Sequence, residues 1–149
     1  MLLKEICTPE TAVCGPDTHV LAAARIMREK HVGDLVVVAD ADGDQTPLGM
    51  ITDRDIVVEV LGRELDARTT KVREIMRRPA VIASETEDAS QAIERMKAHG
   101  VRRIPVMSAE RKLVGILALD DLLRRLAADA GALAEIVARE RGNEQRRRR

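Results

Sequence analysis

The sequence of this chain contains two copies of one pattern. Residues 72–107 align with residues 3–38 at a constant offset of 69, and the offset then falls to 66 because the first copy has three more residues in the loop at 40–44. Positions with the same residue in both copies include Ala23 and Ala92, Met27 and Met96, Val32 and Val101, Val37 and Val106, and Gly49 and Gly115. Two copies are too few for a solenoid. We therefore expect a pseudo-symmetric pair whose halves pack together and leave a cleft at their junction.

Both copies predict the same order of elements. In the first copy, Ala23 and Met27 recur at helical spacing after Asp17, and the β-branched run at 35–38 suits a strand buried on both faces. The remaining predicted elements are a strand at 48–51 and a helix at 53–61, then their counterparts at 88–99, 104–107, 113–117 and 120–128. A short extended stretch precedes each first helix. The chain thus predicts an α/β (α+β) fold of two tandem repeats, each a small mixed sheet covered by two helices.

Composition excludes several classes of protein. The chain has no Phe, Tyr or Trp, so it lacks the aromatic platforms on which single-stranded nucleic acids stack. Its formal net charge is zero, which gives no global basic field, and we do not expect nucleic acid as a partner. The first ten residues do not form a signal peptide, and no apolar stretch is long enough to span a membrane. We expect a cytoplasmic protein.

The repeat resembles the CBS domain, and residues 3–128 resemble a stand-alone CBS pair, or Bateman module. The matching motifs are Ile75-Met76, the Ala-x-x-x-Met helices at 23–27 and 92–96, the strand entry Val-Arg-Arg-Ile-Pro-Val at 101–106, and Gly-Met-Ile-Thr-Asp-Arg-Asp at 49–55. Within the family the chain is similar to the short bacterial pairs of the hypoxic-response type. We assign repeat 1 to residues 1–66, repeat 2 to residues 67–128, and a helical, arginine-rich tail to residues 129–149.

One candidate site lies where the predicted strand at 48–51 turns into a helix at Asp53. Backbone N–H groups at a helix start favour an anion, and Thr52 could cap the helix and offer its hydroxyl to a phosphate. Asp55 could accept two hydrogen bonds from a vicinal diol. The simpler alternative is that Thr52 is only an N-cap and Asp55 only a carboxylate of the first turn. The resemblance implies the first reading, with Thr52 for phosphate and Asp55 for ribose.

The resemblance also implies which residues share a cleft. In the family, each cleft combines the ribose carboxylate of one repeat with the strand entry of the other. Arg102 and Arg103 should therefore face Thr52 and Asp55, and the residues expected to wall the base are Ala80, Val81, Val101 and Pro105. The opposite cleft would join Ala118 and Asp121 to Gly33 and Asp34, without the hydroxyl or the arginines. We expect one competent nucleotide site and one degraded site.

These residues predict a non-enzymatic sensor or regulatory module, involved in signal transduction, that binds an adenine nucleotide. AMP is the first candidate, and ADP, ATP, NAD and S-adenosylmethionine are the others; no permanent cofactor is expected. The alternative is a structural or protein-interaction module whose cleft holds no physiological nucleotide. An enzyme is the third and weakest class, because no catalytic triad, Walker loop or acid–base pair is legible.

Several other residues are better explained without chemistry. The loop at 40–44 has its glycine two positions too early for a calcium loop, and residue 51, where a bidentate Glu belongs, is Ile. His19, His31 and His99 are scattered and form no metal or catalytic pattern. Cys7 and Cys14 align with a methionine and an alanine of the second copy, so both are interpreted as small buried apolar residues.

The tail predicts a contact between subunits. The last helix could continue beyond Gly131 as a second helical stretch whose apolar residues are Leu133, Ile136 and Val137. Such a stripe on a terminal helix usually docks on a partner subunit or on its own body. Family pairs commonly form dimers, so we expect a homodimer. The four terminal arginines are expected to be disordered and dispensable, with weak binding to RNA or an acidic partner as the alternative.

Overall fold

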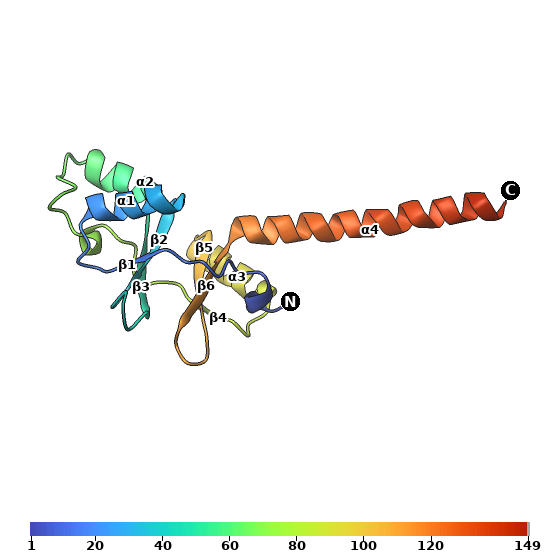
Figure 1. Ribbon diagram of the computed structural model, residues 1–149, viewed down its shortest axis with the longest axis horizontal. Coiled ribbons are helices and arrows are strands. Elements are labelled where there is room, and N and C mark those ends of the chain that lie inside the picture. The colour runs from blue at the N-terminus through green and yellow to red at the C-terminus, as the bar shows by residue number, and fades with distance from the viewer. Residues whose placement is uncertain (149) are drawn as a thin grey trace.

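The computed structural model describes residues 1–148 and consists of two similar halves with a long C-terminal helix (Figure 1). Each half has a three-stranded mixed sheet. The first sheet contains β1 (Val13–Cys14), β2 (Asp34–Val38) and β3 (Pro47–Thr52), and the second contains β4 (Ala83–Ser84), β5 (Arg103–Met107) and β6 (Leu113–Ala118). In both, the first strand pairs in parallel with the second, which pairs antiparallel with the third. The predicted fold of two tandem mixed-sheet repeats is confirmed.

The helices also follow the predicted order. They are α1 (Val20–Lys30), α2 (Asp53–Asp55) with its π-helical continuation η2 (Ile56–Leu61), α3 (Ala89–His99) and α4 (Leu119–Arg147), and single 3-10 turns lie at η1 (Leu3–Glu5) and η3 (Val72–Glu74). Asp88 caps α3 by accepting a hydrogen bond from the Ser90 backbone N–H at 3.0 Å. His31 and Gly100 end α1 and α3 in the left-handed conformation.

Each half has its own aliphatic core, and each core borrows residues from the other repeat. The side chain of Leu3 is fully buried in the core of the second half, and those of Val72 and Ile75 are buried in the core of the first half. The two segments that lead into the repeats are therefore exchanged. This exchange ties the halves together, because neither core is complete without a segment of the other copy.

Backbone pairing holds the exchanged segments in place. Thr8 and Ile116 exchange two N–H to carbonyl bonds of 2.9 Å, and Met50 and Arg77 exchange two of 2.9 and 3.0 Å. The glycine one residue before each hairpin partner makes this approach possible, since a Cβ on Gly49 would collide with the carbonyl of Arg77. A Cβ on Gly115 would likewise collide with the carbonyl of Thr8. The repeated glycines of the sequence thus mark where each lead-in meets the opposite hairpin.

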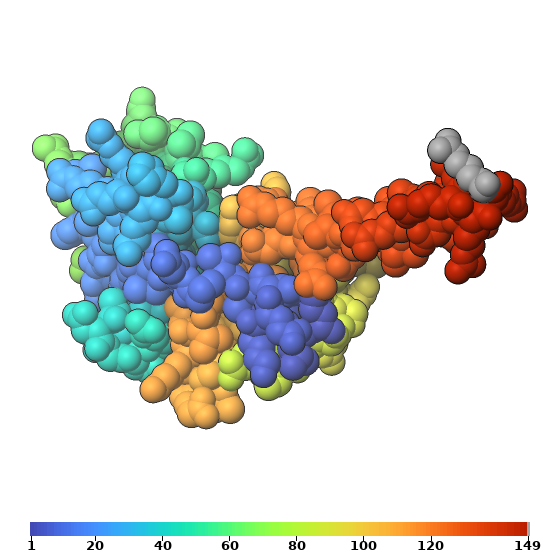
Figure 2. All heavy atoms as spheres, turned by 45° about the vertical axis from the view of Figure 1, so that its right-hand side comes forward, coloured from blue at the N-terminus to red at the C-terminus, as the bar shows by residue number. Residues whose placement is uncertain are grey.

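The C-terminal helix differs from the prediction. The sequence suggested a break at Gly131 and a disordered end, whereas α4 runs as one 29-residue helix from Leu119 to Arg147. Gly131 lies in open space, where it removes helix propensity without disrupting any packing. Beyond its first turn, α4 projects away from the body as an uncovered rod (Figures 1 and 2).

Candidate functional site

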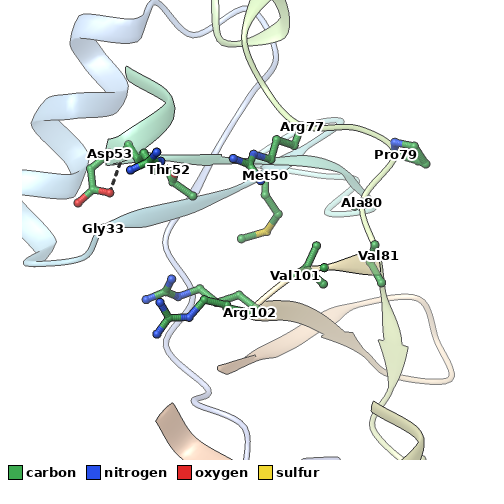
Figure 3. Close-up of a pocket in the computed structure, with 13 residues that line it drawn as sticks. Gly33, Met50, Thr52, Asp53, Arg77, Pro79, Ala80, Val81, Val101 and Arg102 are labelled. Carbon is green, nitrogen blue, oxygen red and sulfur yellow. Dashed lines mark hydrogen bonds between the residues drawn. The ribbon is translucent and has the colours of Figure 1, made fainter. Parts of the chain in front are cut away.

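A cavity of about 370 Å³ lies between the two halves, beside the end of β3 (Figure 3). The first half supplies the end of β3 and the start of α2, and the second half supplies the segments before β4 and β5. The residues that line it are Gly33, Met50, Thr52, Asp53, Arg54, Arg77, Pro79, Ala80, Val81, Gly100, Val101, Arg102 and Arg103. Its size is within the range of small-molecule sites.

The charge of this cavity is strongly positive. Four of its lining residues are arginines, which come from the start of α2, from the exchanged lead-in and from the entry of β5, whereas Asp53 is the acidic residue of the lining. The Asp53 carboxylate already accepts a hydrogen bond from the backbone N–H of Arg54 at 2.7 Å. Figure 3 shows Arg77 beside the first sheet and Arg102 on the other side of the cavity. Such a cavity favours an anionic ligand, such as a phosphate or carboxylate, to which a planar guanidinium group can donate two parallel hydrogen bonds.

Thr52 and Asp55 form a reciprocal cap at the start of α2. The Thr52 Oγ accepts a bond from the Asp55 N–H at 3.1 Å, and the Asp55 carboxylate accepts one from the Thr52 N–H at 3.0 Å. The cap role of Thr52 that the sequence offered is therefore present. Its hydroxyl hydrogen can still be donated to a ligand, because the oxygen uses only an acceptor position in the cap.

The N–H groups at the start of α2 are not available to an anion. The Asp53 N–H donates to the carbonyl of Gly33 at 2.9 Å, and those of Arg54 and Asp55 donate to side chains. The expectation that these groups attract the phosphate is therefore wrong. Attraction for an anion comes from the guanidinium groups instead.

The Asp55 carboxylate is buried, with 5% of the residue exposed, and it is paired. Arg77 Nε donates to Asp55 Oδ1 at 3.2 Å, while Asp55 Oδ2 serves the cap. The sheet pairing of Arg77 with Met50 brings this guanidinium to the cavity. Asp55 consequently lies beneath the lining, and Arg77 covers it.

A second ion pair joins the two halves at this cleft. Arg103 Nε lies 3.1 Å from Asp34 Oδ1, and Asp34 is mostly buried. Burial raises the pKa of Asp34 above its ordinary value, and the Arg103 guanidinium partly offsets this effect. A ligand phosphate placed in the cavity would compete with Asp34 for Arg103.

Most of the residues predicted for this site meet in the cavity. Those that line it are Thr52, Ala80, Val81, Val101, Arg102 and Arg103. Pro105, predicted to wall the base, is buried within β5 and does not line the cavity. Gly33, predicted for the opposite cleft, lines this one. Nucleotide binding by these residues stays a prediction.

The opposite cleft is smaller and acidic. A cavity of about 190 Å³ has Ala118, Asp121 and Asp34 in its lining, which are the residues predicted for the degraded site. Glu10 and Asp120 add two further carboxylates, with Arg124 as the basic residue of this lining. The Asp121 carboxylate accepts a bond from the Ala118 N–H at 3.0 Å, which repeats half of the cap at Thr52. An anionic ligand would be repelled here.

Six residues that line the first cavity were not predicted from the sequence: Met50, Asp53, Arg54, Arg77, Pro79 and Gly100. The first three lie within or beside the motif at 49–55, so a closer reading of that motif could have included them. Arg77 could not have been found in the same way, because it reaches the cavity only through the exchange of the lead-in segments. A basic residue directly after Ile75-Met76 was the available signal.

The acidic loop and the cysteines interpreted as structural have ordinary local surroundings. No group of three or more His, Cys, Asp or Glu side chains within residues 1–148 is placed to hold a metal ion. Asp40 and Asp44 bond the backbone of their own hairpin loop, through the N–H groups of Asp42 and Thr46. Cys14 is buried, and desolvation raises the pKa of its thiol to about 11, so it is protonated at neutral pH.

Comparison with known proteins identifies the family. The family model for the CBS domain matches residues 3–62 and again residues 72–128, which together cover most of the chain. The chain belongs to the CBS-domain family. Hypoxic response protein 1 of Mycobacterium tuberculosis strain H37Rv is 34% identical to this CBS pair over 127 residues, which are 85% of this chain and 86% of that protein.

Solved structures of CBS proteins share the fold. Hypoxic Response Protein I, solved with two coordinated zinc ions, is 31% identical with a TM-score of 0.72, over 83% of this chain and 98% of that one. The CBS domain pair of protein MJ0100, solved with 5′-methylthioadenosine and S-adenosyl-L-methionine, is 25% identical with a TM-score of 0.74, over 87% of this chain and 98% of that one.

Some relatives are longer than this chain. It spans 60% of an uncharacterised Methanopyrus kandleri protein that is 29% identical over 120 residues, 80% of this chain. It spans 23% of the inosine-5′-monophosphate dehydrogenase of Methanocaldococcus jannaschii, which is 31% identical over 121 residues, 81% of this chain. CBS pairs therefore occur as parts of larger proteins as well as nearly alone.

Proposed function

We propose that this CBS pair is a non-enzymatic regulatory module that binds an anionic adenine nucleotide, AMP first, in the cavity between its halves. The observation that carries the proposal is the combination of four arginines with an apolar wall in one cavity of ligand size. Phosphate would meet the guanidinium groups, and the base would lie against Ala80, Val81 and Val101. The adenosyl ligands of the related MJ0100 pair support an adenosine-containing molecule.

The proposed binding would rearrange two ion pairs. The ribose diol would take over the Asp55 oxygen that now accepts a bond from Arg77, and Arg77 would turn to the phosphate. The phosphate would also draw Arg103 from Asp34, which lies at the end of the other cleft. Two ion pairs at the junction of the halves thus exchange partners. A ligand can shift the packing of the halves only through such a difference in affinity between the two arrangements.

A ligand screen tests the proposal. Thermal unfolding would be followed with AMP, adenosine, ADP, ATP, NAD and S-adenosylmethionine, because a ligand that binds the native state raises the midpoint. We expect AMP to raise it more than adenosine does, since adenosine leaves the four arginines without an anion. Calorimetric titration with AMP should give one site per chain. A set of unchanged midpoints would favour the alternative, a protein-interaction module with no physiological nucleotide.

We further propose a cytoplasmic homodimer. The two cysteines of residues 1–148 are unpaired, as expected in a reducing compartment. Leu133, Ile136 and Val137 on α4 are about half to two thirds exposed, and a subunit interface would remove this apolar surface from water. In the part of the chain that the structure describes, the helices are too short or too polar to cross a bilayer.

A further inference from the structure

Helix α4 leaves its apolar face uncovered along most of its length. Leu122, at the end of the first turn, packs on the core of the second half, but no residue of α4 is fully buried. A 29-residue helix is roughly 44 Å long, and Figure 2 shows it extending from the body without a neighbour. Leu126 and Leu133 are each 65% exposed. An isolated helix gains its stability mainly from packing of such a face, so a partner is expected.

The apolar residues of α4 form a coiled-coil seam. Five apolar residues follow one another at alternating spacings of three and four, so they lie along one side of the helix, and this side is called the seam. They are Leu123, Leu126, Ala130, Leu133 and Val137. This is the heptad pattern with a and d positions apolar. The same spacing then continues to Glu140 and Glu144, where the seam becomes acidic. Gly131 and Gly142 occupy outer positions, away from the seam.

We infer that α4 pairs antiparallel with α4 of a second copy of this chain. A parallel pair would place Glu140 opposite Glu140 and Glu144 opposite Glu144 in the seam, and like charges so close are unfavourable. An antiparallel pair separates them, because each seam glutamate then lies opposite a leucine of the second copy. It also aligns the helix dipoles favourably. The inference rests on the homodimer proposed above and adds its geometry.

The antiparallel register follows from matching a positions with d positions. It places Ala130 opposite Leu133 of the second copy, Leu126 opposite Val137, and Leu123 opposite Glu140. This contact is isologous, so each of these pairs occurs twice about one two-fold axis.

The residues beside the seam are complementary in charge in this register. Asp120 of one copy lies beside Arg141 of the second copy at both ends of the helix pair. Between them, Ala127 lies beside Ala134 of the second copy, and two alanines allow the helices to approach closely. Asp120 and Arg141 are both exposed in the single chain, and Asp120 has only a 3.7 Å contact with the exposed Arg102. Both charges are therefore free to form a pair between copies.

The first experiment measures whether α4 is the interface. Light scattering of the full chain should give a dimer at tens of micromolar, and Leu126→Asp should raise the dimer dissociation constant at least tenfold. Ile93→Asp is the matched control, because Ile93 is an exposed apolar residue on α3 (45% exposed) that lies outside the seam. A monomeric full chain would overturn both the homodimer and its geometry. A dimer that only Ile93→Asp dissociates would keep the homodimer and overturn the α4 pairing.

Disulfide formation tests the direction of the pair. In a background of Cys7→Ala and Cys14→Ala, the variants Leu123→Cys and Glu140→Cys are oxidised separately and after mixing with subunit exchange. We expect crosslinks only in the mixture, between position 123 of one copy and position 140 of the other, identified by peptide mass. Crosslinks in either variant alone would show a parallel pair. A light-scattering dimer with no crosslink in any sample would also overturn the register.

A charge swap tests the contact of Asp120 with Arg141. Arg141→Asp should weaken the dimer severalfold, and the double variant Asp120→Arg with Arg141→Asp should restore it. Arg139→Asp is the matched control, because position 139 is two residues away on the outer face of the same helix. If Arg141→Asp and Arg139→Asp weakened the dimer equally and the double variant did not restore it, overall charge would govern the contact. The pair of Asp120 with Arg141 would then be absent, and this register would be overturned.

Discussion

Asp34 is the residue that would most directly oppose the proposed binding of a phosphate-bearing ligand, because it pairs with Arg103. It holds Arg103 at 3.1 Å, and it does so from a mostly buried position where its own charge is unfavourable. Removing the arginine would leave a buried, unpaired carboxylate, which costs free energy. In the proposed binding mode, a phosphate would have to displace Asp34 before it could pair with Arg103.

Asp34→Asn should consequently raise the affinity for AMP by about fivefold, which corresponds to roughly 1 kcal/mol for one competing charged contact. Calorimetric titration measures the change. Asp120→Asn is a suitable control, since its contact with Arg102 is exposed and 3.7 Å long, and it should alter AMP affinity little. Weaker AMP binding by the Asp34 variant would show that the pair supports the cavity instead of competing for it.

The two related aspartates offer a matched pair of substitutions. Asp55 and Asp121 each accept a hydrogen bond at 3.0 Å from the backbone three residues earlier, so their local structural roles are alike. Asp55→Asn should weaken AMP binding by roughly 1 to 3 kcal/mol, because the single amide oxygen cannot serve both the Thr52 N–H and the ribose hydroxyls. Asp121→Asn should leave it within about twofold. If calorimetry found the same loss of AMP affinity in both variants, the nucleotide would not be confined to the cavity beside Asp55.

At the scale of elements, the sequence predicted the helices and strands, which depend on local contacts. It did not predict that the segments leading into the two repeats are exchanged. The order of helices and strands follows from periodicity, which acts over a few residues, and Thr52 could be recognised as a cap because its partner is three residues away. The burial of Leu3 in the second half and of Val72 in the first depends on contacts distant in sequence, which a repeat alone does not reveal. The placement of Arg77 in the site was missed for the same reason.

The exchanged segments should make unfolding a single event. Leu3 is fully buried in the core of the second half, so Leu3→Ala should lower the free energy of unfolding by about 2 to 5 kcal/mol. Leu61→Ala removes a side chain that is mostly exposed and should cost less than about 0.5 kcal/mol. Urea unfolding followed by circular dichroism measures both. We expect one transition in each variant, whereas two separated transitions would show that the halves fold independently.

Across the whole molecule, the ligand cavity and the proposed subunit contact use different parts of the chain. The first cavity is lined by residues between Gly33 and Arg103, and the seam lies between Leu123 and Val137. The acidic cleft lies between them in space and carries Asp120 and Asp121 from the first turn of α4. Asp34 belongs to this cleft and also pairs with Arg103 of the first cavity. Arg102 of the first cavity also contacts Asp120 of α4 at 3.7 Å, so a signal from ligand to dimer has two routes, one through Asp34 and one through Asp120.

Two truncations separate these parts. Ending the chain after Gly142 keeps the apolar part of the seam, from Leu123 to Val137, and also Arg141, so the dimer should persist with unchanged AMP affinity. The terminal arginines should then prove dispensable. Ending the chain after Asp129 removes three apolar seam residues, Ala130, Leu133 and Val137, together with Arg141, and should give a monomer. This shorter chain should still bind AMP, since it retains every residue that lines the first cavity. Light scattering and calorimetry on the same samples decide the matter: a dimer after Asp129 would contradict the role of α4, and loss of AMP binding in the monomer would show that the cavity needs the dimer to be complete.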